Sequence, residues 1–203
     1  MKHSFYMEGY SCSLRPVTAE DAPFIVEARL EDAERNRFIH TISPDVSLQE
    51  AWIEKYNATP NDYYFTVKNN LTGRSEGLIS VYNINGGKGE WGRWVIKKDS
   101  TASVESFYLI CRIAFEQLGL DEIYSRTIVE NRNVVNFHDS VKAERRAVIS
   151  RCFTIGDKTY DAIEHFVDRE RFSAVIRPLL EKTLHWMSEK RNRKKSDKMR
   201  SSV

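Results

Sequence analysis

The chain has 203 residues and a mass of 23.7 kDa, with 31 basic against 29 acidic side chains and a mean hydropathy of −0.52. This composition is that of one ordinary globular domain, long enough to bury a core without disulfides or metals. No apolar run reaches the roughly 18 residues of a membrane helix, and the first residues lack the apolar segment of a signal peptide. We therefore expect a cytoplasmic protein without a membrane span.

The cysteine spacing and the charge distribution argue against a metal site and against a nucleic-acid-binding core. Cys12, Cys111 and Cys152 are far apart and form no CxxC pair, so we expect free thiols and no metal site. Residues 189–203 carry a net charge of +5, which leaves −3 on the preceding part of the chain. A slightly acidic body is atypical of a nucleic-acid-binding core, so no specific nucleic-acid partner is expected. We expect residues 191–203 to form a basic, flexible tail.

The first predicted elements are one strand and two helices. Residues 1–12 show no periodicity and are either a loose lead-in or an extra edge segment. A short strand over 13–17 precedes a helix with Thr18 as N-cap and Asp21 in a capping-box-like position. A second helix begins after Ser47 and ends before Pro60.

Apolar residues then alternate with a period of two, which predicts a meander of three strands over 63–67, 77–82 and 90–96. The helical period returns at Ser103 and stops at Gly119. The remaining elements are a strand over 123–128, a short helix over 133–140, strands near 146–154 and 160–167, and a helix from Phe172 to about Lys190 with an early interruption at Pro178. This order predicts the α+β class.

The strand that ends at Ile96 and the strand that starts near Ile123 are joined through a helix. Such a crossover makes two neighbouring strands parallel within an otherwise antiparallel sheet. Where the two strands diverge, backbone groups lose their ladder partners, and the helix that begins near Ser103 directs free N–H groups and its positive dipole end toward the same cleft. This arrangement predicts a binding site for a pyrophosphate.

Four segments carry a family likeness: 15–21, 90–119, 130–143 and 160–172. In the second segment, Gly-Arg-Trp-Val-Ile at 92–96 and Phe-Glu-Gln-Leu-Gly at 115–119 have the spacing of the GNAT superfamily of acyl-CoA-dependent N-acyltransferases. From about Leu14 to Phe172 the chain resembles that superfamily, and most closely its ribosomal-protein acetyltransferase branch. The resemblance implies a mostly antiparallel mixed sheet, flanked by helices, with a V-shaped splay between two central parallel strands. It also implies a GNAT domain over 13–172. The helix over 173–190 lies outside the family core, and its apolar spacing predicts that it packs on the domain or on a second subunit of a homodimer.

The resemblance implies acetyl-CoA as the co-substrate. The residues implied to hold it are Trp94, Val95, Ile96, Ser100, Thr101, Ala102, Ser103 and Val104, together with Asn131 and Phe137. The two glycines of the family's phosphate loop fall on Thr101 and Ser103, and its Gln or Arg falls on Ser100. Hydroxyl donors can replace them, with Lys97 and Lys98 as nearby cations. A GNAT-like domain that does not bind CoA is the alternative.

Two residues are the candidates for proton transfer. His138 occupies the position of a family tyrosine that protonates the departing thiolate, and an imidazole can serve as such an acid. Packing of a buried histidine against the cofactor is the alternative. Strand alternation places Glu90, Gly92 and Trp94 on one face, from which Glu90 could act as the base; a solvated edge residue is the alternative. The backbone N–H groups near Val95 and Ile96 are expected to polarise the thioester carbonyl.

The acceptor is expected to be a primary amine. The same segments resemble GNAT members that acylate nucleotide-activated amino sugars for surface polysaccharides, and the residues expected to bind such an acceptor are Arg29, Arg37, Trp91 and Glu164. Because Glu164 and His165 are adjacent on one strand, only one of them can face the cleft. A peptide N-terminus or another small amine, as in the ribosomal-protein branch, stays open, and so does a catalytically inactive binding module. A peptide needs an open groove, whereas a nucleotide sugar needs a basic, aromatic-lined pocket.

Overall fold

A computed structural model describes residues 2–200, with the side chains of residues 2–190. One sheet of eight strands runs through the molecule in the order β1-β2-β3-β4-β5-β6-β8-β7. The strands are β1 (Met7–Glu8), β2 (Cys12–Pro16), β3 (Tyr63–Asn69), β4 (Ser75–Asn85), β5 (Lys88–Ile96), β6 (Glu122–Ile128), β7 (Glu144–Ile155) and β8 (Lys158–Asp168). The helices are α1 (Ala22–Leu30), α2 (Val46–Ala58), α3 (Ser103–Arg112), α4 (Arg132–Ser140), α5 (Arg169–Arg171) and α6 (Arg177–Arg200), with short turns η1 (Ala19–Asp21), η2 (Ile113–Gln117) and η3 (Phe172–Ile176). Every helix and strand expected over residues 13–172 is present, with ends shifted by a few residues.

The expected splay is present between β5 and β6. These two strands form the parallel pair of the sheet, and the other neighbouring strands are antiparallel. The parallel pairing extends only from Lys88–Glu122 to Glu90–Tyr124, although β5 continues to Ile96 and β6 to Ile128. Beyond these pairs the two strands diverge, which confirms the α+β fold with a V-shaped opening.

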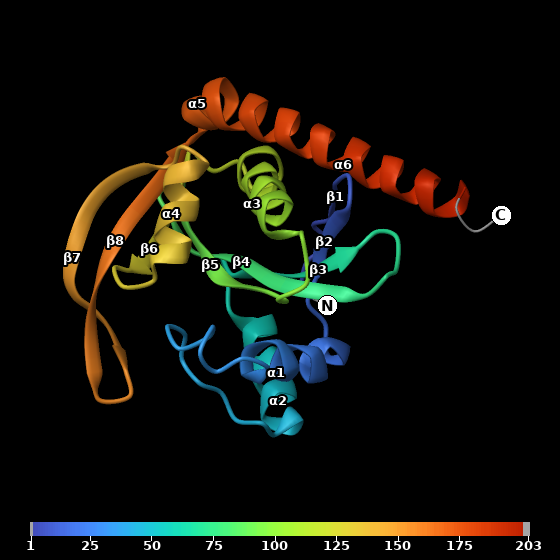
Figure 1. Ribbon diagram of the computed structural model, residues 1–203. Coiled ribbons are helices and arrows are strands. Elements are labelled where there is room, and N and C mark those ends of the chain that lie inside the picture. Colours follow the sequence, from blue (N-terminus) through green and yellow to red (C-terminus); the bar gives the residue numbers. More distant parts are fainter. Residues whose placement is uncertain (1, 201–203) are drawn as a thin grey trace.

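Helices cover both faces of the sheet, α1 and α2 on one side and α3 and α6 on the other (Figure 1). The alternation of the strands divides the core accordingly. Phe65, Ile79 and Ile96 belong to the cluster that includes Phe107 and Ile110 of α3. Their strand neighbours pack on the opposite face, in a cluster with Ile25 of α1 and Ile53 of α2; these neighbours are Tyr64, Leu78 and Val95. The sheet is therefore buried on both faces around β3, β4 and β5.

The start of α1 is held as the capping pattern predicts. The Asp21 carboxylate accepts the Thr18 N–H at 2.8 Å and the Arg15 Nη1 at 2.9 Å. The capping box is complete, although the helix begins with the 3-10 turn η1 rather than with a full α turn. This anchor joins β2 to the start of α1.

The structure decides between the two alternatives for the first segment and moves the end of the last helix. Met7 and Glu8 pair with Leu14 and Ser13, so the first segment is an edge strand rather than a loose lead-in. At the other end, α6 continues to Arg200 instead of ending near Lys190, so the expected tail is helical over 191–200. Residues 201–203 of that tail lie outside the described residues.

The final helix is irregular where Pro178 predicts an interruption. The π turn η3 directly precedes α6. Pro178 has no N–H for the carbonyl of Ala174, and its ring crowds that carbonyl. A wider turn relieves this crowding while the helix continues, and Ile176, Leu180 and Leu184 still pack into the core.

Lys142 ends α4 in the left-handed region, at φ +67°, where the family motif has a glycine. A residue with a β-carbon loses about 1 kcal/mol or more in this conformation. We therefore expect Lys142→Gly to raise the free energy of unfolding by about 1 kcal/mol in urea denaturation. Lys142→Ala is the matched control, because it removes the same long side chain and keeps the β-carbon. An equal gain from alanine would show that the backbone conformation is not the cause.

Candidate active site

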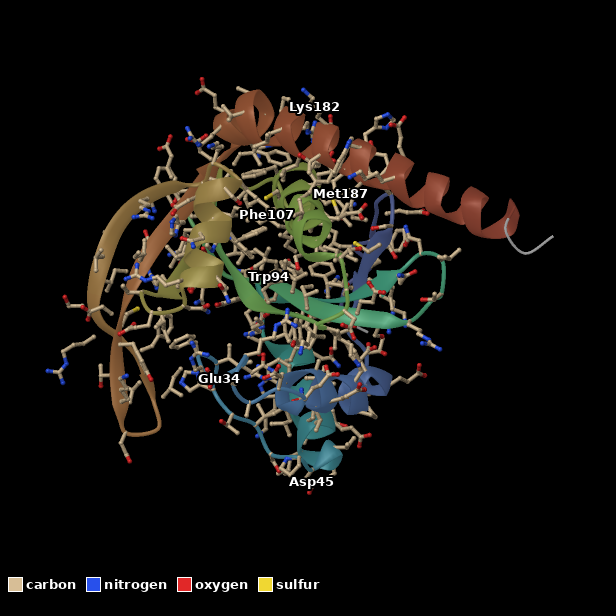
Figure 2. All side chains as sticks on the ribbon, in the orientation of Figure 1. Glu34, Asp45, Trp94, Phe107, Lys182 and Met187 are labelled. Atoms are coloured by element: carbon tan, nitrogen blue, oxygen red, sulfur yellow. The ribbon has the colours of Figure 1, made fainter. Side chains whose placement is uncertain are left out.

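Two adjoining cavities open where β5 and β6 diverge, with volumes of about 240 and 270 Å³. We call the first the strand cavity, because it extends between β5 and β6 to Glu90, Arg126 and His138. The second is the helix cavity, which extends from Ile96 to Ser103 at the start of α3. The residues that line both are Phe38, Ile39, Trp94, Asn131 and Val134. Figure 2 labels Trp94 at this junction, between Phe107 of α3 and the α1 and α2 side of the sheet.

The helix cavity has the groups that a phosphorylated ligand requires. Ser103 begins α3, whose first N–H groups have no partner within the helix. Asn131 precedes α4, and its side-chain amide makes no hydrogen bond to another described residue. Phe137 forms an apolar wall with its ring 4.7 Å from that of Trp94. Of the residues expected to hold the co-substrate, six line this cavity: Trp94, Val95, Ile96, Ser103, Asn131 and Phe137.

The other four expected residues do not line either of the two cavities. The Ser100 hydroxyl donates to Glu76 Oε2 at 2.7 Å and accepts the Ala102 N–H at 3.1 Å, so it caps the turn instead of facing the opening. Ala102 and Val104 pack against the core under α3, and Thr101 lies between Ser100 and this packed turn. Lys97 pairs with Glu27 and Glu31, so its charge is already balanced.

A β-bulge changes which side chains of β5 point to each face of the sheet. Ser80 of β4 pairs with Gly92, whereas Leu78 pairs with Val95, so one residue of β4 lies opposite two residues of β5. The prediction that Glu90 and Trp94 share a face is therefore wrong. Trp94 lies on the side of Trp91, with ring centroids 5.7 Å apart, because the extra residue shifts the alternation by one position.

The extra residue is Arg93, which adopts a left-handed conformation at φ +48°. Its guanidinium binds both carboxylate oxygens of Asp62, at 2.7 and 2.9 Å, and lies 4.5 Å from the centroid of the Tyr82 ring. These contacts hold a backbone conformation that is unfavourable for any residue other than glycine. The Arg93–Asp62 pair therefore maintains the bulge that turns Trp94 toward α4.

His138 lies deeper than a proton donor at an open cleft. Its side chain is 1% exposed, and Nε2 lies 3.2 Å from Ser125 Oγ and 3.4 Å from Thr127 Oγ1. Its ring stacks on that of His165 at 4.6 Å. Burial, followed by the charge of His165, lowers the pKa of His138 to about 3. The imidazole is then neutral at neutral pH and is not a general acid there, so the geometry favours the packing alternative for this residue.

This low pKa predicts a pH dependence of stability. Histidine in the unfolded chain titrates near pH 6.5, whereas folded His138 stays neutral down to about pH 3. Its contribution is therefore complete above pH 6.5 and is lost as the pH falls below that value, by about 2 kcal/mol at pH 5. We expect His138→Phe to flatten the fall in the free energy of unfolding between pH 7 and 5, measured in urea.

The control for this prediction is His185→Phe, because His185 lies on the exposed part of α6. The charged groups nearest to the His138 and His165 rings are Asp139, which is 3.3 Å from His165 Nε2, and Arg145, which pairs with Asp139. If His138→Phe and the wild type lose stability equally over this range, the buried imidazole is not the group that titrates.

Glu90 faces the strand cavity and is only 6% exposed, so the solvated-edge alternative does not describe it. Its Oε2 accepts the Asn83 amide at 3.1 Å and lies 3.8 Å from Arg126 Nη1. The nearby carboxylate, after burial, also raises the pKa of Tyr82, so that phenol keeps its proton. Glu90 is thus a buried carboxylate on the cavity wall, with Asn83, Arg126 and Tyr82 as its polar neighbours.

Two of the four residues expected to bind the acceptor line the strand cavity, and two do not. Arg29 and Trp91 line the strand cavity, and Trp91 lies 5.1 Å from the His138 ring. Arg37 pairs with Glu34 and lines neither cavity. Glu164 binds Arg126 and Arg146, each at 3.0 Å, and likewise lines neither cavity. Of the adjacent pair on β8, His165 faces α4 and Glu164 the opposite side.

The strand cavity has a roof that the sequence did not reveal. Phe38, Ile39 and His40, from the segment between α1 and α2, meet Phe153 and Ile155 of β7 there. His40 Nε2 donates to the Thr154 carbonyl oxygen at 3.1 Å, and the Phe38 ring meets Tyr160 edge-on at 6.0 Å. These contacts join segments more than a hundred residues apart in the chain, and the apolar Phe38 and Ile39 in an aperiodic segment were the available signal.

Comparisons with known proteins concern the family and the fold. A model of the acetyltransferase (GNAT) domain matches residues 12–143. No match is found among curated protein sequences. The apo structure of FdhC, a nucleotide-linked sugar GNAT, has a TM-score of 0.70 and 23% identity, over 84% of this chain and 94% of that one.

Two further structures have the same fold. A GCN5-related N-acetyltransferase from Brucella melitensis has a TM-score of 0.75 and 17% identity, over 86% of this chain and 83% of that one. A variant of the spermidine N-acetyltransferase SpeG from Vibrio cholerae has a TM-score of 0.71 and 16% identity, over 81% and 98%. Within residues 2–200, no helix is long and apolar enough to cross a bilayer.

Proposed function

Because the chain belongs to the acetyltransferase (GNAT) family, we propose that it transfers the acetyl group of acetyl-CoA to the primary amine of a nucleotide-activated amino sugar. The observation that carries this proposal is the pair of cavities that meet at Trp94, in the part of β5 beyond its last pair with β6. One cavity begins at a helix N-terminus and the other ends at a buried carboxylate. A thioester and an amine that enter from the two sides would meet at the junction.

The helix cavity accommodates the co-substrate. The first turn of α3 would receive the diphosphate, and the Asn131 amide and the Phe137 ring would contact the pantetheine arm. When bound, acetyl-CoA supplies an activated thioester carbonyl. The backbone N–H groups of β5 beyond Glu90, on the side that faces β6, have no ladder partner there and can polarise this carbonyl.

Glu90 is the proposed base. An acceptor amine must lose a proton as its nitrogen attacks the carbonyl carbon, because the nitrogen becomes positively charged when the C–N bond forms. The C–S bond then breaks, and the sulfur leaves as thiolate. Glu90 lines the cavity on the acceptor side of Trp94 and can take this proton directly or through one water. Both substrates are held at once, so no acyl-enzyme is required.

The roof supports a small acceptor over a peptide. Contacts of His40 with Thr154 and of Phe38 with Tyr160 bridge the strand cavity on one side, which narrows the room for the open groove that a peptide chain would need. Phe38, Trp91 and Phe153 offer aromatic surface, and Arg29 offers positive charge. Arg126 also lines the cavity, but its charge is paired with Glu164 and Glu90. An aromatic and basic pocket suits the base and phosphates of a nucleotide, and the nucleotide-linked sugar GNAT among the similar structures supports this class.

The test combines binding with product analysis. Isothermal titration with acetyl-CoA is expected to give a saturable signal, and mass spectrometry is expected to detect an N-acetylated product with one or more UDP- or dTDP-linked amino sugars. Spermidine and peptides with free N-termini are included in the same panel. Acetylation confined to either of them would replace the acceptor class, and the absence of both binding at millimolar CoA and product would favour a catalytically inactive module.

A further inference from the structure

The proposed diphosphate site is short of positive charge. The family's Gln or Arg in the phosphate loop is Ser100 here, and the Ser100 hydroxyl is committed to Glu76 and to the Ala102 N–H. Lys97 is committed to Glu27 and Glu31. Backbone N–H groups of α3 alone would leave most of the charge of a diphosphate unbalanced.

Arg35 supplies a cation from a different part of the chain. It lies on the segment between α1 and α2 and lines the helix cavity together with Ile96 and Ser103. It also lines a third cavity along Val95–Asp99, the turn that leads to α3; at about 240 Å³ this is slightly smaller than the helix cavity, and we call it the smaller cavity. Its guanidinium forms no hydrogen bond or ion pair with any described residue, whereas its backbone N–H is fixed by Asp32 Oδ1 at 2.9 Å. The backbone is thus anchored while the charged group remains available at the cavity mouth.

We propose that Arg35 binds the diphosphate of the coenzyme and replaces the cation that the phosphate loop lacks. This inference rests on the proposed function and adds a binding residue to the same site. A guanidinium can donate two parallel hydrogen bonds to phosphate oxygens, which an ammonium group cannot do. Lys98 lines the smaller cavity but not the helix cavity, so Arg35 is the better placed of the two cations. Asp32 and Asp99 border the smaller cavity and limit the gain from Arg35.

The experiment compares Arg35→Ala with Arg74→Ala. Arg74 is an exposed arginine in the turn between β3 and β4 and lines neither the strand nor the helix cavity, so its removal costs the same charge away from the site. Isothermal titration of the full chain with acetyl-CoA and with acetyl-dephospho-CoA is expected to show a roughly tenfold rise in Kd for Arg35→Ala and no rise for Arg74→Ala. Acetyl-pantetheine, which has no diphosphate, is expected to bind both variants and the wild type equally, measured by NMR chemical shifts.

Each other pattern of results overturns the inference. Equal Kd values of the two variants for acetyl-CoA would mean that Arg35 does not contact the coenzyme. A loss that extends to acetyl-pantetheine would mean that Arg35 shapes the cavity rather than binding phosphate. A loss for acetyl-CoA without one for acetyl-dephospho-CoA would move the contact to the 3′-phosphate. Failure of the wild type to bind acetyl-CoA is a separate outcome, because it removes the proposed function and this inference with it.

Discussion

Glu90→Gln is expected to lower kcat by at least about 100-fold while leaving the affinity for acetyl-CoA unchanged. The glutamine keeps the size of the side chain and can still hydrogen-bond to Asn83, but it cannot accept the proton that the attacking amine must lose. Because Glu90 lines the strand cavity and not the helix cavity, coenzyme binding does not depend on it. Steady-state kinetics with the acceptor found by product analysis measure kcat, and isothermal titration measures coenzyme affinity.

The matched control is Glu122→Gln. Glu122 is buried to a similar extent and pairs with Arg146 at 2.6 Å on a neighbouring strand, but it lines neither cavity. Its substitution removes one carboxylate from the same surface without touching the reaction. Wild-type kcat in Glu90→Gln would exclude Glu90 as the base.

Asp62→Ala is expected to lower the free energy of unfolding by about 3 kcal/mol, because it leaves the Arg93 guanidinium without its partner in a largely buried position. The side chains of Arg93 and Asp62 are only 25% and 10% exposed. The same pair holds Arg93 in its left-handed conformation and so keeps Trp94 on the side of α4. Urea denaturation measures the loss, and turnover should fall with it because the cavity junction is displaced.

A double variant separates the ion pair from the backbone. Arg93→Gly removes the unpaired charge and accepts a positive φ without strain, so adding it to Asp62→Ala should recover part of the lost stability. Glu34→Ala, which breaks the exposed pair with Arg37, is the control and should cost less than about 1 kcal/mol. If the double variant loses as much as the two single variants combined, Arg93 and Asp62 do not act as a pair.

Much of the architecture follows from local patterns. The change of period from 3.6 to 2 and back locates the helices around the meander. The helix between Ile96 and Ile123 is long enough to carry the chain back to the end of the sheet where the preceding strand began, so the next strand runs parallel to it. The opening between β5 and β6 and the helix N-terminus beside it were therefore predictable. Segments 92–96 and 115–119 further indicated the family.

The chemistry of individual side chains depended on contacts that periodicity does not encode. One additional residue at Arg93 moved the Trp94 side chain to the other face of the sheet, because side chains alternate along a strand and one inserted residue shifts that alternation. Burial against Trp91 and His165 kept His138 neutral, although an exposed imidazole titrates near neutral pH. The positions of Arg35 and the roof depended on contacts between distant segments. Sequence determined which elements form and in what order, because these depend on neighbours in the chain; tertiary packing decided which side chains face the cavities and which carry charge there, because these depend on neighbours in space.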